Sequence, residues 1–240
     1  MNDVFDRFYL DNSWGNRESK SGPGSTLLYT TNIRQEIVRF CRDKAIRSFF
    51  DAPCGDFNWM SRVEFPNFIQ YIGGDVSQIA VIDAASKFAG GRRTFRTFDI
   101  TTDKFPQADL WFCRDCFFHL PFSDILRALQ NFASSDVKYL FTTTHINTIG
   151  FLNTDIAAGG FRLIDLFSDP FQLPREVLFW AADYIHPHPR REMCVWKREQ
   201  VSNALPGFAA KLAAARESKA SGSTAAPASR NSSPPDSVVE

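Results

Sequence analysis

The segment Phe49-Phe50-Asp51-Ala52-Pro53-Cys54-Gly55-Asp56-Phe57 runs from an apolar stretch into a tight acidic turn. Residues 46–50 predict a short buried strand, because the acid, the proline and the glycine that follow stop a strand and turn the chain. A helix is then expected from about Asp56, with the apolar side chains of residues 59–63 on one face. Its free N–H groups would suit an anion or a polar cofactor, and an ordinary strand-to-helix turn is the alternative.

A second acidic strand end follows along the chain. Residues 69–74 predict a strand that leads into Asp75, 24 residues beyond the first acid. An acid about 20 residues after a glycine-containing turn is the usual partner of the two ribose hydroxyls, and Gly73-Gly74 would let a backbone or a ligand approach closely. A dinucleotide is disfavoured, because its pyrophosphate needs glycines where this loop has Pro53 and Phe57.

Four segments between roughly residues 45 and 145 resemble the class I S-adenosylmethionine-dependent methyltransferases. They are Asp51-Ala-Pro-Cys-Gly55-Asp56-Phe57, Gly73-Gly74-Asp75-Val76-Ser77, Phe98-Asp99-Ile100 and Asp109-Leu-Trp-Phe-Cys-Arg114-Asp115-Cys-Phe-Phe-His119-Leu120. The first segment departs from the family's pattern, since Gly55 is the one glycine that it keeps. Ser21-Gly-Pro-Gly-Ser25 and the Arg114-Asp115 pair further resemble a subgroup of small methyltransferases.

This resemblance implies a doubly wound, mostly parallel seven-stranded α/β sheet with helices on both faces, the Rossmann-like methyltransferase fold. It implies S-adenosyl-L-methionine as cofactor, with the Asp51 loop at the methionine end, Asp75 on the ribose and Asp99 near the adenine amino group. A solvated strand-end carboxylate is the alternative for Asp99. The cofactor-binding residues expected from the likeness are Asp51, Pro53, Cys54, Gly55, Asp56, Asp75, Val76, Asp99, Ile100 and Arg114.

Strands alternate with helices along the chain, which by itself predicts an open α/β sheet with right-handed crossovers. Further strands are expected at residues 94–98, 109–114 and 138–144, and helices at residues 26–44, 77–88 and from 121. Ligands in such sheets bind beyond the carboxyl ends of the strands. The side chains at or just past those ends are Asp51, Asp75, Asp99, Asp115 and His145. Their convergence predicts a single functional cleft.

Finer features of these elements are also expected. Ser25 or Thr26 is available as N-cap of the first helix, and Ser77 as N-cap of the helix 77–88. The latter helix is predicted to turn Ile79, Ile82 and Ala85 inward. After the fifth strand, residues 161–167 are expected as a short strand or helix, and Cys194-Val-Trp196 as a late strand that completes the sheet edge.

Methyl transfer needs positioning of donor and acceptor, and a base where the acceptor carries a proton. The candidate bases are Asp115, His119 and His145. Asp115 could orient the His119 imidazole through one turn of helix, whereas a hydrogen-bonded, purely structural histidine is the alternative for both imidazoles. Arg114 offers a bidentate fork for an acidic acceptor or the methionine carboxylate, or else pairs with Asp115 or Asp56.

No metal site is predicted. Cys113-Arg-Asp-Cys116 with His119 superficially resembles a ligand set, but strand positions three apart point to opposite faces. No second cysteine pair follows at the usual spacing. His186-Pro-His188-Pro is interpreted as an exposed turn.

Three parts are expected along the chain. Residues 1–25 form an N-terminal arm or lid with several aromatic side chains, residues 26–205 the methyltransferase-like domain, and residues 206–240 a disordered tail with a possible short helix at 208–218. The acceptor, expected to be a small or sugar-like molecule, would lie between the arm and the region after the fifth strand. Two other classes stay open, a non-catalytic scaffold and a nicotinamide-dependent oxidoreductase.

Composition limits the partners and the compartment. The 240 residues carry a formal net charge of +0, so no global field attracts nucleic acid or an anionic membrane. The N-terminus lacks the pattern of a signal peptide, and no run of eighteen apolar residues occurs, so a cytoplasmic location without membrane contact is expected. The five cysteines are expected as thiols. The oligomeric state does not follow from the sequence.

Overall fold

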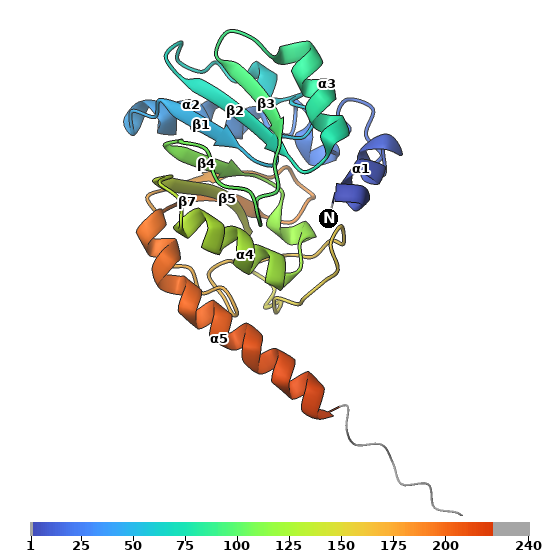
Figure 1. The fold of residues 1–240 in the computed structure, drawn as a ribbon, viewed down its shortest axis with the longest axis vertical. Helices are drawn as coiled ribbons and strands as arrows, with labels where there is room; N and C mark the ends of the chain where they lie inside the picture. The colour runs from blue at the N-terminus through green and yellow to red at the C-terminus, as the bar shows by residue number, and fades with distance from the viewer. Residues whose placement is uncertain (1, 223–240) are drawn as a thin grey trace, which may run out of the picture.

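The computed structural model describes residues 2–222, which form one α/β sheet flanked by helices (Figure 1). The strands are β1 (Ser48–Asp51), β2 (Gln70–Asp75), β3 (Arg93–Thr97), β4 (Leu110–Cys113), β5 (Tyr139–His145), β6 (Phe179–Ala182) and β7 (Arg191–Lys197). The α-helices are α1 (Asn2–Leu10), α2 (Thr31–Asp43), α3 (Gln78–Phe88), α4 (Phe122–Ala133) and α5 (Arg198–Gly222). This confirms the predicted doubly wound architecture.

The seven strands lie in the order β3-β2-β1-β4-β5-β7-β6. The first five in this order pair in parallel, and β7 pairs antiparallel with both β5 and β6. β1 lies between β2 and β4, so the chain moves outward from β1 in one direction and then returns to continue in the other. Ligands of such sheets bind in the crevice at this reversal, beyond the strands' carboxyl ends.

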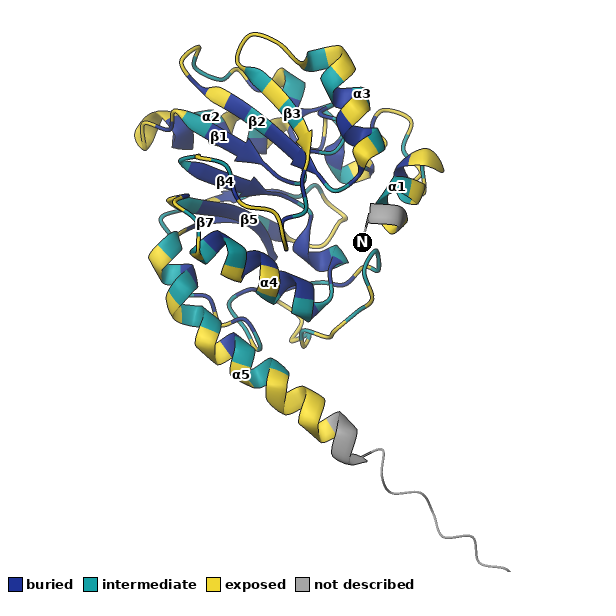
Figure 2. Cartoon of the chain, viewed as in Figure 1, coloured by how far each residue is buried: buried dark blue, intermediate teal, exposed yellow. Residues whose placement is uncertain are grey.

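Each face of the sheet has its own apolar core, because successive strand residues point to opposite faces. Phe50 and Trp111 pack on one side with α4, and Phe49 and Phe112 pack on the other with α2. The inner strands are buried along almost their whole length (Figure 2). Such burial explains why β4, Leu-Trp-Phe-Cys, is apolar at every position.

The helix expected after β1 does not form. Residues 52–69 contain only the 3₁₀ turn Met60–Arg62 (η2). Gly55 and Phe57 have positive φ of 52° and 58°, which no right-handed helix accepts. The Asp56 carboxylate accepts hydrogen bonds from the N-terminal arm, so it does not cap a helix there. The loop therefore does not lead directly into a helix of its own.

Two other helix predictions need correction. α2 begins at Thr31, five residues later than the earliest predicted start, and its N-cap Thr30 makes no side-chain capping bond. α3 is capped as predicted, since Ser77 Oγ accepts from Ala80 N. However, its buried side is Ala80, Val81 and Ala84, while Ile82 is 60% exposed. The inward side chains are alanine and valine, which are smaller than isoleucine. The spacing of the isoleucines therefore predicted the wrong buried face for α3.

The C-terminal part also differs from the prediction. β7 is an inner strand, because the unpredicted β6 covers it and forms the sheet edge. Residues 161–167 form neither strand nor helix. α5 runs from Arg198 to Gly222, so it contains the short helix predicted as possible at 208–218 and extends it at both ends, and Phe208 is buried. The rest of the predicted tail lies outside the described residues. None of the described helices has the length and apolar character needed to cross a membrane.

Candidate functional site

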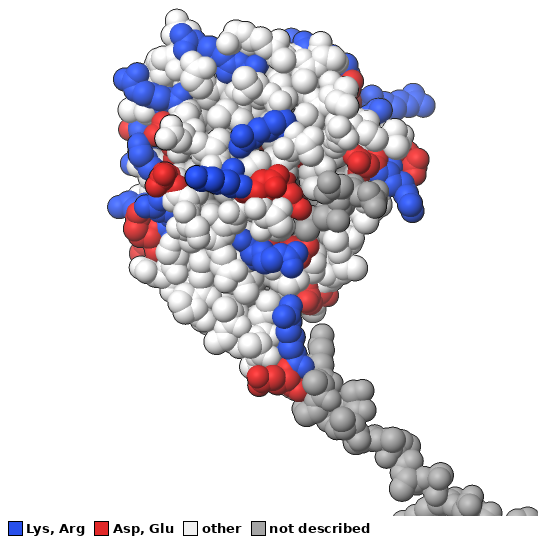
Figure 3. Space-filling view, viewed as in Figure 1, with Lys and Arg blue, Asp and Glu red and all other residues white. Residues whose placement is uncertain are grey.

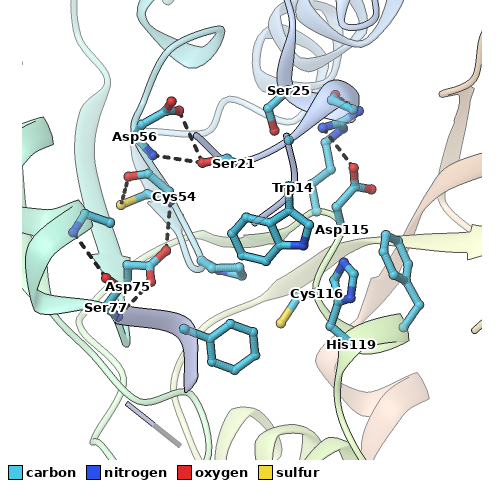
Figure 4. Close-up of a pocket in the computed structure, with 18 of the residues that line it drawn as sticks. Trp14, Ser21, Ser25, Cys54, Asp56, Asp75, Ser77, Asp115, Cys116 and His119 are labelled. Atoms are coloured by element: carbon cyan, nitrogen blue, oxygen red, sulfur yellow. Dashed lines mark hydrogen bonds and ion pairs between the residues drawn. The ribbon is translucent and has the colours of Figure 1, made fainter. Parts of the chain in front are cut away.

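A cavity of about 320 Å³ opens at the carboxyl ends of the parallel strands. Every residue predicted for cofactor binding or catalysis lines it: Asp51, Pro53, Cys54, Gly55, Asp56, Asp75, Val76, Asp99, Ile100, Arg114, Asp115, His119 and His145. Figure 4 shows Asp56 and Asp75 on one side of this hollow and Asp115 and His119 on the other, with Trp14 between them. The strand ends thus meet in one cleft.

Asp75 is held by backbone amides. Its Oδ2 accepts from Gly55 N at 2.9 Å, and its Oδ1 accepts from Ser77 N, also at 2.9 Å. Burial raises its pKa to about 6, although these two amide bonds work in the opposite direction. Because an ionised carboxylate offers about four acceptor sites, each oxygen keeps a lone pair for a ligand hydroxyl.

Asp51, at the end of β1, is a buried acid whose carboxylate has one side-chain partner among the described residues. Tyr71 Oη donates to its Oδ2 at 2.6 Å. Burial raises the pKa of Asp51 to about 8, against the lowering effect of that hydrogen bond. Asp51 therefore favours its protonated form more strongly than an ordinary aspartate does.

Gly55 makes room for the N-terminal arm. A Cβ at Gly55 would collide with Ser21 Oγ, and Asp56 N donates to that same oxygen at 3.1 Å. The Asp56 carboxylate accepts from Ser19 Oγ at 2.9 Å and from Lys20 N at 2.9 Å. Asp56 therefore fastens the arm across the loop. Gly55 therefore both accommodates Ser21 of the arm and lines the cavity.

Gly73 and Gly74 make room for aromatic rings within the protein. A Cβ at Gly73 would lie 2.6 Å from the Phe95 ring, and one at Gly74 would lie 3.0 Å from the Phe50 ring. Cys54 N donates to Gly74 O at 2.9 Å, so a backbone does approach Gly74 as expected, whereas the close approach of a ligand stays a prediction.

Asp99 lies two residues past β3. Its Oδ1 accepts from Thr101 N at 2.8 Å and from Thr101 Oγ1 at 2.6 Å. Among the described residues, no donor reaches its Oδ2. The neighbouring Phe98 and Ile100 are buried apolar side chains that line the same end of the cavity. A free carboxylate oxygen beside apolar side chains suits the amino group of a flat base.

Arg114 lies at the centre of a buried ion network. Its guanidinium binds Asp183 through two bonds of 2.9 and 3.0 Å, and its Nη2 also donates to Gly24 O at 2.8 Å. Its Nη1 lies 3.2 Å from Asp115 Oδ2. Of the two predicted partners of Arg114, Asp115 is paired with it and Asp56 is not. Most donors of Arg114 are used inside the protein, which leaves little for a ligand carboxylate.

Arg191 is a site residue that the sequence did not predict. Its Nη2 lies 3.0 Å from Asp115 Oδ2, and its Nε donates to Asp183 O at 2.7 Å. Its guanidinium also lies over the Tyr29 ring, 4.9 Å from the centroid. Arg191 is one of several charged residues beside the apolar run of β7, and such a pattern does not show which distant residues an arginine will contact.

Asp115 is unsuited to act as a base. Burial alone would raise its pKa, but Arg114 and Arg191 outweigh that effect and hold the pKa below its usual value. Its φ of 55° is a strained conformation for a residue with a side chain, and Asp115 N donates to Thr143 Oγ1 at 2.9 Å. The Asp115 carboxylate therefore stays ionised and paired.

His119 is oriented by a backbone carbonyl. Its Nδ1 lies 2.7 Å from Gly160 O, so the predicted orientation by the Asp115 carboxylate is wrong. A carbonyl oxygen only accepts, hence Nδ1 carries the proton and Nε2 of the neutral ring has a lone pair. Burial lowers the pKa of His119. A neutral imidazole in this tautomer can accept a proton at Nε2.

His145 has the opposite tautomer. Its Nδ1 accepts from Ile164 N at 3.1 Å, so the proton of the neutral ring is on Nε2. Burial, followed by the charge of Arg191, lowers its pKa to about 4. This geometry favours the structural alternative for His145, which ties the 161–167 segment to the end of β5.

The described side chains form no cluster of three His, Cys, Asp or Glu able to hold a metal ion. Cys116 lines the cavity, whereas burial raises the pKa of Cys113 well above its usual value. Cys116 therefore contributes to the lining of the cavity, and Cys113 belongs to the buried core.

The N-terminal arm covers the cavity. Tyr9 Oη donates to Asp83 at 2.8 Å and Ser77 Oγ donates to Asp6 at 2.6 Å, which ties α1 to α3. Trp14 and residues 21–25 then line the hollow. The arm is in the position of a lid, and its opening and closing stay a prediction.

Searches with family models and among curated proteins found no match. Solved structures do match. Magnesium protoporphyrin IX methyltransferase (ChlM) from Synechocystis PCC 6803 with bound S-adenosylhomocysteine has a TM-score of 0.58 at 15% identity, over 82% of this chain and 97% of that one. PigF with S-adenosylhomocysteine has a TM-score of 0.56 at 15% identity, over 81% and 62% of the two chains. At such low identity these likenesses show that the chain has the fold of class I methyltransferases.

Proposed function

We propose that this protein is an S-adenosylmethionine-dependent methyltransferase that acts on a small-molecule acceptor. The observation that carries the proposal is the fixed carboxylate of Asp75, which keeps free lone pairs beside the Gly55 loop. Solved structures of the same fold, such as ChlM and PigF, hold S-adenosylhomocysteine. The ribose hydroxyls of such a cofactor would donate to Asp75.

The rest of the cavity suits the other parts of this cofactor. Asp99 Oδ2 and the apolar Ile100 would receive the adenine, and the loop from Asp51 to Gly55 would lie against the methionine part. When bound, S-adenosylmethionine supplies a methyl group on a positively charged sulfur. The chain's own part is to hold that group still, exclude water and accept a proton, because methyl transfer depends chiefly on positioning.

A small acceptor accords with the surface charge. The chain has a formal net charge of +0. On the face drawn in Figure 3, Lys and Arg side chains are interspersed with Asp and Glu. Neither observation favours a nucleic-acid partner, which binds largely through its phosphates. The cytoplasmic location stays a prediction.

Titration calorimetry with S-adenosylhomocysteine and, separately, NAD tests the proposal. We expect wild type to bind S-adenosylhomocysteine, and Asp75→Asn to bind it about ten- to one-hundred-fold more weakly, since hydrogen bonds to charged groups contribute about 1.5–3 kcal/mol. The exposed Asp136→Asn is the matched control and should match wild type. Binding of NAD alone would favour an oxidoreductase, and binding of neither compound would favour a scaffold.

A further inference from the structure

Aromatic rings surround His119 at the far end of the cavity from Asp75. The ring centroids of Phe118, Phe161 and Trp14 lie 4.6, 5.9 and 6.1 Å from that of the imidazole. The rings come from separate parts of the chain: the arm, the 3₁₀ turn Phe117–His119 (η3) and the segment after β5. We call Trp14, Phe118, His119 and Phe161 the ring cluster.

Part of this cluster is open. Phe161 is 61% exposed although it lines the cavity, whereas Phe118 is 3% exposed. An exposed aromatic side chain at the wall of a concave site is typical of a surface that a ligand covers. Flat rings gain most from stacked or edge-on contact with other flat rings, at centroid distances of about 4.5–7 Å.

Free polar groups are few around the ring cluster. The Asp115 carboxylate, which lines the same cavity, is paired with Arg114 and Arg191. His119 Nδ1 is bound to Gly160 O. Its Nε2 has no hydrogen-bond partner among the described residues. A sugar would leave several hydroxyls unpaired here, at a cost of about 1–3 kcal/mol each, whereas a molecule with one hydroxyl would leave none.

Resting on the proposed methyltransferase function, we propose that the acceptor is a flat aromatic molecule with a ring hydroxyl. Its ring lies against Trp14 and Phe161, and its hydroxyl faces His119 Nε2. The acceptor oxygen forms a bond to the methyl carbon, the electron pair of the broken carbon–sulfur bond stays on the now neutral sulfur, and the hydroxyl proton passes to His119 Nε2.

Acidity also favours a ring hydroxyl over an alcohol. A phenol such as that of tyrosine has a pKa of about 10, far closer to that of an imidazole than the roughly 15.7 of water. Proton transfer to a general base is most effective when the two pKa values are close. A neutral imidazole therefore accepts the proton of an aromatic hydroxyl at a smaller free-energy cost than the proton of an alcohol.

Binding to the protein saturated with S-adenosylhomocysteine tests the class of acceptor. The probes are 2-naphthol, its saturated analogue decahydro-2-naphthol, and D-glucose. We expect 2-naphthol to bind at least tenfold more tightly than the other two. Phe161→Ala should weaken 2-naphthol about tenfold and leave S-adenosylhomocysteine affinity unchanged. Leu152→Ala is the matched control, because Leu152 is 84% exposed in the same segment but does not line the cavity.

His119→Asn tests the proton transfer. The asparagine amide can still donate to Gly160 O, but it has no counterpart of Nε2. We expect 2-naphthol to bind within about threefold of wild type, while its methylation slows by about 10²–10⁴-fold, the usual contribution of a general base. Loss of binding together with rate would contradict a role as base.

The outcomes separate the two proposals. If S-adenosylhomocysteine binds but 2-naphthol binds no better than the saturated analogue or glucose, the acceptor class is wrong and the methyltransferase function stands. If S-adenosylhomocysteine does not bind, both fail.

Discussion

The two sides of the cavity use the same residue, aspartate, in different ways. On the β2 side, Asp75 is held by two backbone amides, and its pKa is raised to about 6. On the β4 side, Asp115 is held by two arginines, and its pKa is lowered. An amide-held carboxylate keeps acceptor sites for a ligand, whereas an arginine-held carboxylate is committed to the protein.

The position of an aspartate at a strand end therefore does not determine what that aspartate does. Both acids follow parallel strands and line one cavity. What separates them is the partner that each finds elsewhere in the chain: Gly55 for Asp75, and Arg191 for Asp115. We therefore propose that Asp75 binds the cofactor and that Asp115 contributes to stability.

The largest effect is expected when Arg114 is removed from its ion network. Arg114→Met leaves the fully buried Asp183 carboxylate without its bidentate partner, so the free energy of unfolding should fall by about 3–5 kcal/mol in urea titration. Lys87→Met removes a more exposed ion pair, with Asp83, and should cost about 0–1 kcal/mol. Equal losses in the two variants would contradict a structural role for the Arg114 network.

A smaller effect is expected from disturbing the loop that supplies an amide to Asp75. Gly55→Ala places a side chain at a positive φ and against Ser21 Oγ. The strained conformation alone should cost about 1–2 kcal/mol of stability. Limited proteolysis should also cut the N-terminal arm faster. Gly207→Ala in α5, where a Cβ meets no atom within 4 Å, should be neutral or slightly stabilising. An arm equally protected in both variants would contradict the fastening role of the loop.

The smallest expected effect separates the two acids by pH. A ligand that donates to Asp75 needs the ionised carboxylate, whose pKa in the free protein is about 6. The affinity for S-adenosylhomocysteine should therefore be near its maximum at pH 7 and fall about tenfold by pH 5. In Asp75→Asn this dependence should vanish. A dependence that persists in the variant would assign the titration to another group.

The sequence predicted the sheet and the rim of the cavity well, and for a physical reason. The inner parallel strands β1 and β4 are buried on both faces, so Phe49-Phe50 and Leu110-Trp-Phe-Cys113 stand out as apolar runs. The residues that follow them are then placed at one edge by topology alone. This is why Asp51, Asp75 and Asp115 were found together.

The roles of those residues were less predictable. Which nitrogen of His119 carries the proton depends on Gly160 O, 41 positions away, and local spacing cannot reveal such a partner. The pairing of Arg114 with Asp183 spans 69 positions. β6 is a different case, because residues 177–182 are an apolar run from which this strand could have been predicted.

A crystal structure of the protein with S-adenosylhomocysteine would show whether Asp75 binds the ribose. We predict the ribose hydroxyls within about 3 Å of the Asp75 carboxylate and the adenine beside Asp99 and Ile100. Electron density for the nucleoside outside this cavity, or an Asp75 carboxylate that makes no contact with it, would contradict the account.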